Sequence, residues 1–140
     1  MSKVDECRVL TLNRHYDPRG SLTPAQNDDE LPFAIRRGFY LYDIPGGTER
    51  GGHSHRQLHQ MLVAVSGSFT VTLTDGVETR RIVLNRPYHG LYIPPGVWNT
   101  MDDFASGSIC LVLASAPYDE SDYVRDYQEF LRLTQSKRIL

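Results

Sequence analysis

The sequence is poor in the features that mark membrane-bound and secreted proteins. It contains only two cysteines, Cys7 and Cys110, among its 140 residues. No apolar run approaches the roughly 18 residues that cross a bilayer, and residues 1–6 contain no apolar segment like that of a signal peptide. Two cysteines are a weak disulfide signal, and Cys110 lies in the apolar run 109–113, which predicts a buried free thiol. We therefore expect a cytoplasmic protein that does not bind membranes.

The sequence also lacks an excess of charge of either sign. It has 15 basic and 17 acidic residues, which give a net charge of −2. This balance argues against the strongly basic surface on which nucleic-acid binding depends, although a local basic pocket for a phosphate remains compatible with it. Hydrophobic residues make up 40% and charged residues 23%, as in globular proteins. The length suits one domain rather than two, so we predict a single domain over residues 1–140.

Most of the chain consists of short apolar or alternating runs separated by glycine and proline. Residues 69–73 alternate with threonine, which is typical of a half-exposed strand, and Asp75-Gly76 is a hairpin turn signal. Further strands are expected at residues 8–12, 33–43, 61–65, 78–84, 91–93 and 109–114. Strands spaced at about 8–12 residues predict an all-β sandwich or barrel.

The C-terminal region has a different periodicity. Apolar residues recur there at helical spacing, which gives one apolar helix face: Tyr123, Val124, Tyr127, Phe130 and Leu131. Capping and acidic residues precede them: Asp119, Ser121 and Asp122. We predict one C-terminal helix of about three or four turns that packs on the β-structure.

Three of the five histidines lie within seven residues, at His53, His55 and His59. On a strand, the His53-x-His55 spacing places both rings on the same face. Two imidazoles that face a barrel interior can bind a metal or share acid–base chemistry. A pair on a loop at the rim would have neither function, and all three interpretations are open at this point.

The surroundings of the histidines resemble the two cupin motifs, in the correct order. The first motif matches at Gly47, His53-x-His55, Gln60 and Gly67, and the second at Pro94-x-Gly96 and Asn99. The resemblance implies a cupin-type jelly-roll β-barrel with the C-terminal helix added to it.

The chain departs from the metal-binding cupins at two ligand positions. Gln60 stands where those proteins carry Glu, and Asn99 stands where they carry His. Amides are poor ligands for transition metals, so we expect no metal and no other cofactor. In a regular strand His59 would point the same way as His53 and His55, which leaves a three-histidine metal site as the alternative.

Several longer segments narrow the resemblance to one cupin family. They are Asp17-x-Arg19-Gly20-Ser21-Leu22, Pro32-Phe33-x-Ile35-x-Arg37, Arg50-Gly51-x-His53-x-His55 and Tyr118-Asp119-Glu120-x-Asp122-Tyr123. Together they resemble the dTDP-sugar 3,4-ketoisomerases, with a match from about residue 8 to residue 131. The resemblance implies a metal-free homodimer with strand exchange between subunits, acting on dTDP-4-keto-6-deoxyglucose.

The resemblance also suggests roles for individual residues. A ketone is moved from carbon 4 to carbon 3 through an enediol, which requires a base near neutral pKa and a donor to the developing oxyanion. We expect His55 to be the base and His53 to polarise the oxygens or relay protons, with the reverse assignment as the alternative. Tyr40 is the candidate for a further hydroxyl, unless it is a core or interface aromatic residue.

Four further residues are candidates for substrate binding. Arg19 would hold the diphosphate through charge-assisted hydrogen bonds, and Arg37 would bind phosphate or serve as an ion-pair partner. Trp98 would line the barrel mouth or belong to the core, and Asn99 replaces a histidine that some relatives carry.

Three other functions are alternatives for a cupin with these histidines. A cupin-type nucleotide-sugar epimerase would need the same histidines, a non-catalytic carbohydrate-binding cupin would not, and a metal-dependent oxygenase conflicts with Gln60 and Asn99. For the ketoisomerase, the face of the enediol that is protonated at carbon 4 decides between a galacto and a gluco product.

Overall fold

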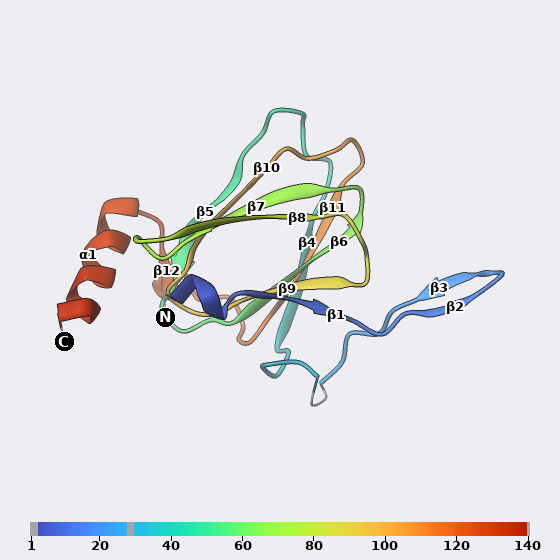
Figure 1. The fold of residues 1–140 in the computed structure, drawn as a ribbon, viewed down its shortest axis with the longest axis horizontal. Coiled ribbons are helices and arrows are strands. Elements are labelled where there is room, and N and C mark those ends of the chain that lie inside the picture. Colours follow the sequence, from blue (N-terminus) through green and yellow to red (C-terminus); the bar gives the residue numbers. More distant parts are fainter. Residues whose placement is uncertain (1–2, 28–29, 140) are drawn as a thin grey trace.

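Two antiparallel five-stranded sheets pack face to face in the computed structural model, which describes residues 3–27 and 30–139 (Figure 1). The first sheet has the order β1-β9-β6-β11-β4, formed by Arg8–Thr11, His89–Ile93, Gln60–Ser66, Ile109–Ala114 and Arg37–Leu41. The second has the order β12-β5-β10-β7-β8, formed by Tyr123–Val124, Arg50–His55, Trp98–Asp102, Phe69–Thr74 and Thr79–Leu84. This arrangement confirms the predicted all-β jelly roll.

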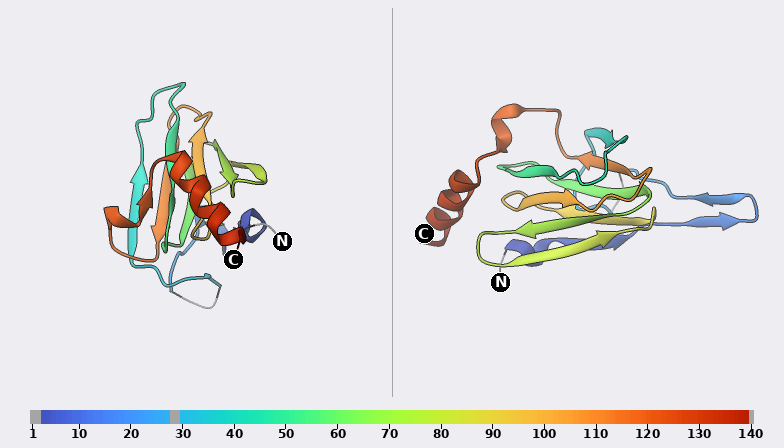
Figure 2. Two further views of the ribbon diagram at one scale, coloured as in Figure 1. Left: turned by 90° about the vertical axis from the view of Figure 1, so that its left-hand side faces the viewer. Right: turned by 90° about the horizontal axis from the view of Figure 1, so that it is seen from above.

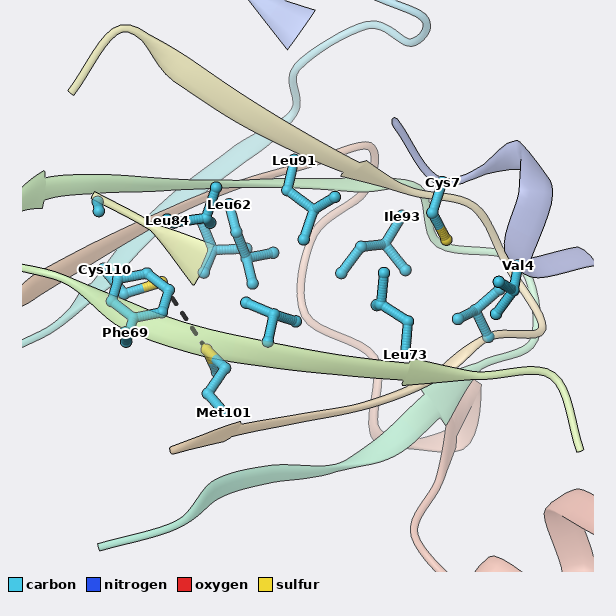
Figure 3. Packing of buried hydrophobic residues seen from close by; sticks show 14 residues of the cluster. Val4, Cys7, Leu62, Phe69, Leu73, Leu84, Leu91, Ile93, Met101 and Cys110 are labelled. Atoms are coloured by element: carbon cyan, nitrogen blue, oxygen red, sulfur yellow. Dashed lines mark hydrogen bonds between the residues drawn. The ribbon is translucent and has the colours of Figure 1, made fainter. Parts of the chain in front are cut away.

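The main core lies between the two sheets, as the close-up in Figure 3 shows. On β7, Phe69, Val71 and Leu73 point into it and are at most 1% exposed, so the alternation read from residues 69–73 identifies the inward face. From the opposite sheet come Leu62 on β6 and Leu91 on β9. Each such side chain contributes about 1.5–3 kcal/mol when it leaves water, and this shared core fixes the relative position of the sheets.

Both cysteines are free and buried. Cys110 lies in the main core beside Met101, with a sulfur–sulfur distance of 4.0 Å (Figure 3). Burial raises the pKa of each thiol to about 12. The prediction of a buried free thiol at Cys110 is therefore confirmed.

The C-terminal helix exists but begins later than predicted. A 3₁₀ turn, η2 (Glu120–Asp122), leads into the short strand β12, and helix α1 covers Tyr127–Ile139. Tyr123 and Val124 pair with β5 instead of starting the helix. Asp126 caps α1, because its carboxylate accepts a hydrogen bond from the Gln128 amide at 2.8 Å. The prediction that Tyr123 and Val124 belong to the first turn of the helix was therefore wrong.

A third, two-stranded sheet projects from the body of the molecule. It is a hairpin of β2 (His15–Asp17) and β3 (Gly20–Leu22). Figures 1 and 2 show this hairpin beyond one end of the sandwich, while β12 and α1 lie at the opposite end. Tyr16 and Leu22 on the hairpin are 70% and 62% exposed.

Within the part of the chain that the structure describes, no helix has the length and apolar character needed to cross a membrane.

Candidate active site

Two glycines set the direction of the histidine pair. Gly51 and Gly52 on β5 both have positive φ, at 87° and 79°, a conformation that side-chain-bearing residues rarely adopt. The ladder between β5 and β10 shifts register at this point, because Asn99 pairs with His53 but Thr100 pairs with Gly51. The glycines thus form a bulge, a device that redirects the side chains beyond it.

The bulge turns His53 and His55 toward the interior. Asn99 lies opposite His53 on β10 and opposite Leu73 of the core on β7, so all three share the inner face. The two imidazole rings lie edge to face with centroids 5.0 Å apart. Tyr123, the partner of His55 on β12, packs against both rings, at 5.1 Å from His53 and 4.4 Å from His55. The predicted pair is therefore one aromatic cluster with Tyr123.

The two histidines have different polar partners. His55 is 4% exposed, and its Nδ1 lies 3.1 Å from Oδ2 of Asp122. His53 is half-buried, and its Nδ1 is buried without a hydrogen-bond partner in the described part of the chain. Burial, and then the neighbouring His55, lower the pKa of His53 to about 4. The pKa of His55 is also lowered by burial, but Asp122 opposes this shift. Both shifts favour the neutral form of the ring.

A pocket of about 280 Å³ adjoins His55. Its other lining residues include Arg37, Tyr123, Asp122 and Ser115. Arg37 begins β4, and its guanidinium lies over the rings of Phe39 and Tyr118, at 5.0 and 5.6 Å. Its Nε is buried and has no partner among the described residues. Arg37 therefore lines the same pocket as His55, and its role in substrate binding stays a prediction.

Asn99 and Trp98 point in opposite directions from β10. Asn99 is 2% exposed, and its Nδ2 is 3.5 Å from the carbonyl oxygen of His53. It therefore lies beside His53 on the inner face of the sheet. Trp98 faces outward and packs against Phe130 of α1, with ring centroids 5.5 Å apart. The structure thus corrects the expectation that Trp98 lines the barrel mouth, since the helix covers that face of the sheet.

Tyr40 and Arg19 do not reach the pocket within this chain. Phe39 and Leu41 of β4 face the core, so the alternation of the strand turns Tyr40 outward, where it is 63% exposed beside Tyr42. Arg19 lies at the tip of the projecting hairpin with a 90% exposed side chain, which pairs with Asp17 at 2.9 Å. Within one chain, neither joins the histidines.

His59 lies apart from the other two histidines. β5 ends at His55, so no regular strand continues to His59. Its Nδ1 is 2.7 Å from the Tyr92 hydroxyl, and its ring stacks on Phe33. In the described residues, no group of three or more His, Cys, Asp or Glu side chains is placed to hold a metal ion.

The segment from Tyr118 to Tyr123, which the sequence predicts to cap the C-terminal helix, instead contributes residues next to the histidines. Besides Asp122 and Tyr123, it contributes Tyr118 and Glu120 to a charged cluster with Arg125. Arg125 binds Glu120 through two hydrogen bonds, at 2.7 and 3.0 Å, and its guanidinium lies 4.2 Å from the Tyr123 ring centroid. The Tyr118 hydroxyl donates to the same carboxylate. The only signal for this arrangement was the density of acidic and tyrosine residues in a segment assigned to a helix start.

Comparisons with known proteins agree on one family. The model of the FdtA family, described as WxcM-like, C-terminal, matches residues 5–135. A TDP-4-oxo-6-deoxy-alpha-D-glucose-3,4-oxoisomerase of Aneurinibacillus thermoaerophilus is 42% identical over 125 residues, which cover 89% of this chain and 90% of the relative.

Solved structures give the same result. A 3,4-ketoisomerase from Helicobacter canadensis is 42% identical with a TM-score of 0.90, covering 93% of this chain and 98% of that one. A His→Asn mutant of the 3,4-ketoisomerase QdtA from Thermoanaerobacterium thermosaccharolyticum, in complex with TDP-4-keto-6-deoxyglucose, is 38% identical with a TM-score of 0.90, covering 93% and 94%.

A more distant structure shares the fold alone. A dTDP-4-dehydrorhamnose 3,5-epimerase from Bacillus anthracis is 15% identical with a TM-score of 0.75, covering 86% of this chain and 78% of that one.

Proposed function

The chain belongs to the FdtA, WxcM-like family of sugar 3,4-ketoisomerases, and from this premise we propose that His53 and His55 carry its acid–base chemistry. The enzyme converts dTDP-4-keto-6-deoxyglucose (the TDP-4-keto-6-deoxyglucose of its relatives) into a 3-keto isomer. The observation that carries the proposed mechanism is the contact between the two imidazole rings, of which His55 lines a pocket together with Arg37.

The reaction requires two proton transfers at carbon and one between oxygens. The ketone at carbon 4 acidifies the hydrogen on carbon 3, and a neutral imidazole removes it to give an enediolate. A proton then adds to carbon 4, and the proton of the carbon 3 hydroxyl passes to the oxygen on carbon 4, which leaves the ketone on carbon 3. No atom is gained or lost, so the enzyme needs only groups that hold and return protons.

The surroundings support His55 as the base for the carbon-bound protons. A base that keeps a proton until the enediolate is reprotonated is an imidazolium in the interval, and the Asp122 carboxylate 3.1 Å away stabilises that charge. His53 has no such partner, and its pKa of about 4 keeps it neutral. His53 therefore suits the oxygens. Arg37 would hold a substrate oxygen, and Asn99 would hold the backbone of His53 through its hydrogen bond to the His53 carbonyl oxygen.

We further propose that the diphosphate is held by Arg19 in a homodimer. The 90% exposed Arg19 and the projecting hairpin place this cation away from the histidines of its own chain. The exposed Tyr16 and Leu22 on the hairpin, Tyr40 on the edge strand β4 and Tyr42 just after that strand are apolar surface that a second subunit would cover. Arg19 would then complete the site of the partner subunit. A nucleotide-linked substrate also supports the expected cytoplasmic location.

The mechanism is tested by following dTDP-4-keto-6-deoxyglucose by NMR in D2O. The wild type should form the 3-keto sugar and place deuterium on carbon 4. His55→Asn should lower kcat by about 10²–10⁴-fold, the usual contribution of a general base, and should stop carbon 3 exchange while substrate still binds. His53→Asn should slow the reaction less and retain some exchange at carbon 3.

Other outcomes of this experiment contradict the proposal in distinct ways. If His53→Asn abolishes exchange while His55→Asn retains it, the two roles are reversed. If neither variant is slowed about tenfold, general-base catalysis by this pair is wrong. Deuterium at carbon 5 with an inverted centre would indicate the epimerase, and binding without any exchange would indicate a carbohydrate-binding cupin.

A further inference from the structure

In the segment between β11 and α1, the carboxylate of Asp122 contacts His55. Asp122 lies at the end of η2, and its carboxylate binds groups that are more than 60 residues away in the sequence. Its Oδ2 is 3.1 Å from Nδ1 of His55, its Oδ1 accepts from the Gln57 amide at 2.8 Å, and its Oδ2 also accepts from the Leu58 amide at 3.3 Å. Its carbonyl oxygen accepts from the Arg56 amide at 2.9 Å. Asp122 is thus locked against the turn that follows β5.

The chemistry of the carboxylate fixes the tautomer of its partner. An ionised carboxylate only accepts hydrogen bonds, so Nδ1 of His55 carries the proton and Nε2 keeps its lone pair. The contact is shielded, because the side chains of His55 and Asp122 are 4% and 16% exposed. We propose that Asp122 is a positioning residue of the ketoisomerase, which holds the His55 ring and its Nδ1–H tautomer so that Nε2 is the nitrogen that exchanges protons with the sugar. This inference rests on the proposed function of the histidine pair. It holds whether His55 exchanges protons with the carbons or with the oxygens of the sugar.

The charges around His55 show what removal of Asp122 would do. Burial lowers the pKa of His55, and the charge and hydrogen bond of Asp122 raise it. Arg37 on β4 and Arg125 beyond β12 both act in the direction of burial, and the rings of His53 and Tyr123 occupy the remaining sides. Without the carboxylate, burial and the two arginines would no longer be opposed by Asp122, so the pKa of His55 should fall further.

The test is Asp122→Asn, which conserves size and keeps one acceptor oxygen. If that oxygen stays on the Gln57 amide, the amide NH2 faces Nδ1 of His55 and forces the Nε2–H tautomer. We expect kcat to fall at least about 100-fold with KM changed less than about threefold, because the loss is in the proton transfer rather than in binding. The acid limb of the kcat–pH profile should move to lower pH. In ¹⁵N NMR of histidine-labelled enzyme, the His55 signals, assigned with His55→Asn, should change from Nδ1–H to Nε2–H.

Asp126→Asn is the matched control. It makes the same chemical change four residues later, at a carboxylate that caps α1 through Gln128 and lies outside the pocket lining. Its kcat, acid limb and His55 tautomer should equal those of the wild type. A purely structural role for Asp122 would lower activity in Asp122→Asn without moving the acid limb or the tautomer, and that result would overturn the inference.

The NMR measurement also separates this inference from the proposed function. It needs no substrate and uses His55→Asn only to assign the signals, because the wild type itself must show Nδ1–H at His55. A wild-type Nε2–H tautomer would refute the positioning role of Asp122 even in an active ketoisomerase. Correct tautomers in an enzyme that retains its turnover in His55→Asn would instead refute the proposed role of His55.

Discussion

His53 and His55 differ by two positions on one strand, yet the fold gives them different chemical characters. His55 faces a carboxylate that can compensate a positive ring, whereas Nδ1 of His53 has no partner among the described residues. The difference comes from what lies opposite each residue, since β12 brings the segment with Asp122 to His55 and β10 brings Asn99 to His53. Two identical side chains can therefore divide an acid–base reaction between them.

The depressed pKa of His53 predicts how stability depends on pH. In the unfolded chain His53 becomes protonated below pH 6.5, whereas in the folded chain it becomes protonated only below about pH 4. Stability therefore falls as the pH drops through this window, by about 3 kcal/mol for this group, and is unaffected above it. Chemical denaturation at several pH values should show this slope.

His53→Asn should flatten that slope, because the variant has no imidazole at this position. His89→Asn, a histidine substitution outside the pocket, should keep it. Equal slopes in the wild type and His53→Asn would show that the folded protein does protonate this ring freely.

At the scale of elements, α1 stabilises the outer face of the sheet that carries the histidines. Phe130 is 2% exposed and packs on Trp98 together with Val124 of β12. Phe130→Ala should lower the free energy of unfolding by about 3–5 kcal/mol, the usual cost of truncating a buried phenylalanine. Trp98 is the single tryptophan, so urea denaturation followed by its fluorescence measures this cluster directly.

The control for the helix is Val83→Ala on β8. Val83 is 60% exposed, so its truncation should change stability by less than about 0.5 kcal/mol. If Phe130→Ala were as mild as Val83→Ala, the helix would contribute little to the stability of the sandwich.

The strands that the sequence revealed are those with a continuous apolar run, such as β6 and β11, or with apolar residues alternating with threonine, such as β7. Residues 69–73 became β7 with its apolar residues inward. Strand β10 was missed because its inward positions include Asn99, a polar residue buried between two ladders. For Trp98 the alternative of a core residue is confirmed, because it is buried in a cluster with Phe130 and Val124. The role of Tyr40 stays a prediction, since its side chain is exposed within one chain.

The candidate site was only half visible in the sequence. The histidine pair follows from local spacing, and the cupin and ketoisomerase motifs supported it. The contact between His55 and Asp122 joins positions 67 residues apart, and no local pattern encodes such a distance. Tyr123 was also misplaced. Its spacing from Tyr127 predicted a helix, but it belongs to β12, which pairs with β5.

At the scale of the whole molecule, the projecting hairpin is the feature that a single chain leaves unexplained. It carries the exposed Arg19 away from the histidines, although a diphosphate needs a cation near the sugar site. The proposed homodimer resolves this conflict, because a closed pair of subunits exchanges equivalent elements in both directions. Sedimentation should accordingly give a mass near twice the 15.9 kDa of one chain.

Mixed dimers test whether Arg19 acts across the subunit boundary. Arg19→Ala alone should raise KM about tenfold or more, since a charge-assisted contact to phosphate contributes about 1.5–3 kcal/mol, and His55→Asn alone should be nearly inactive.

When the two variants are expressed together, a mixed dimer has one site with both substitutions and one site with neither. Random pairing should then restore about a quarter of the wild-type activity at low substrate concentration, because half of the dimers are mixed and each has one intact site. If Arg19 served its own chain, every site in the mixed dimer would carry one substitution, and coexpression would restore nothing. Recovery of activity therefore identifies the hairpin as part of the partner's active site, and its absence would leave Arg19 without a role in binding across the interface.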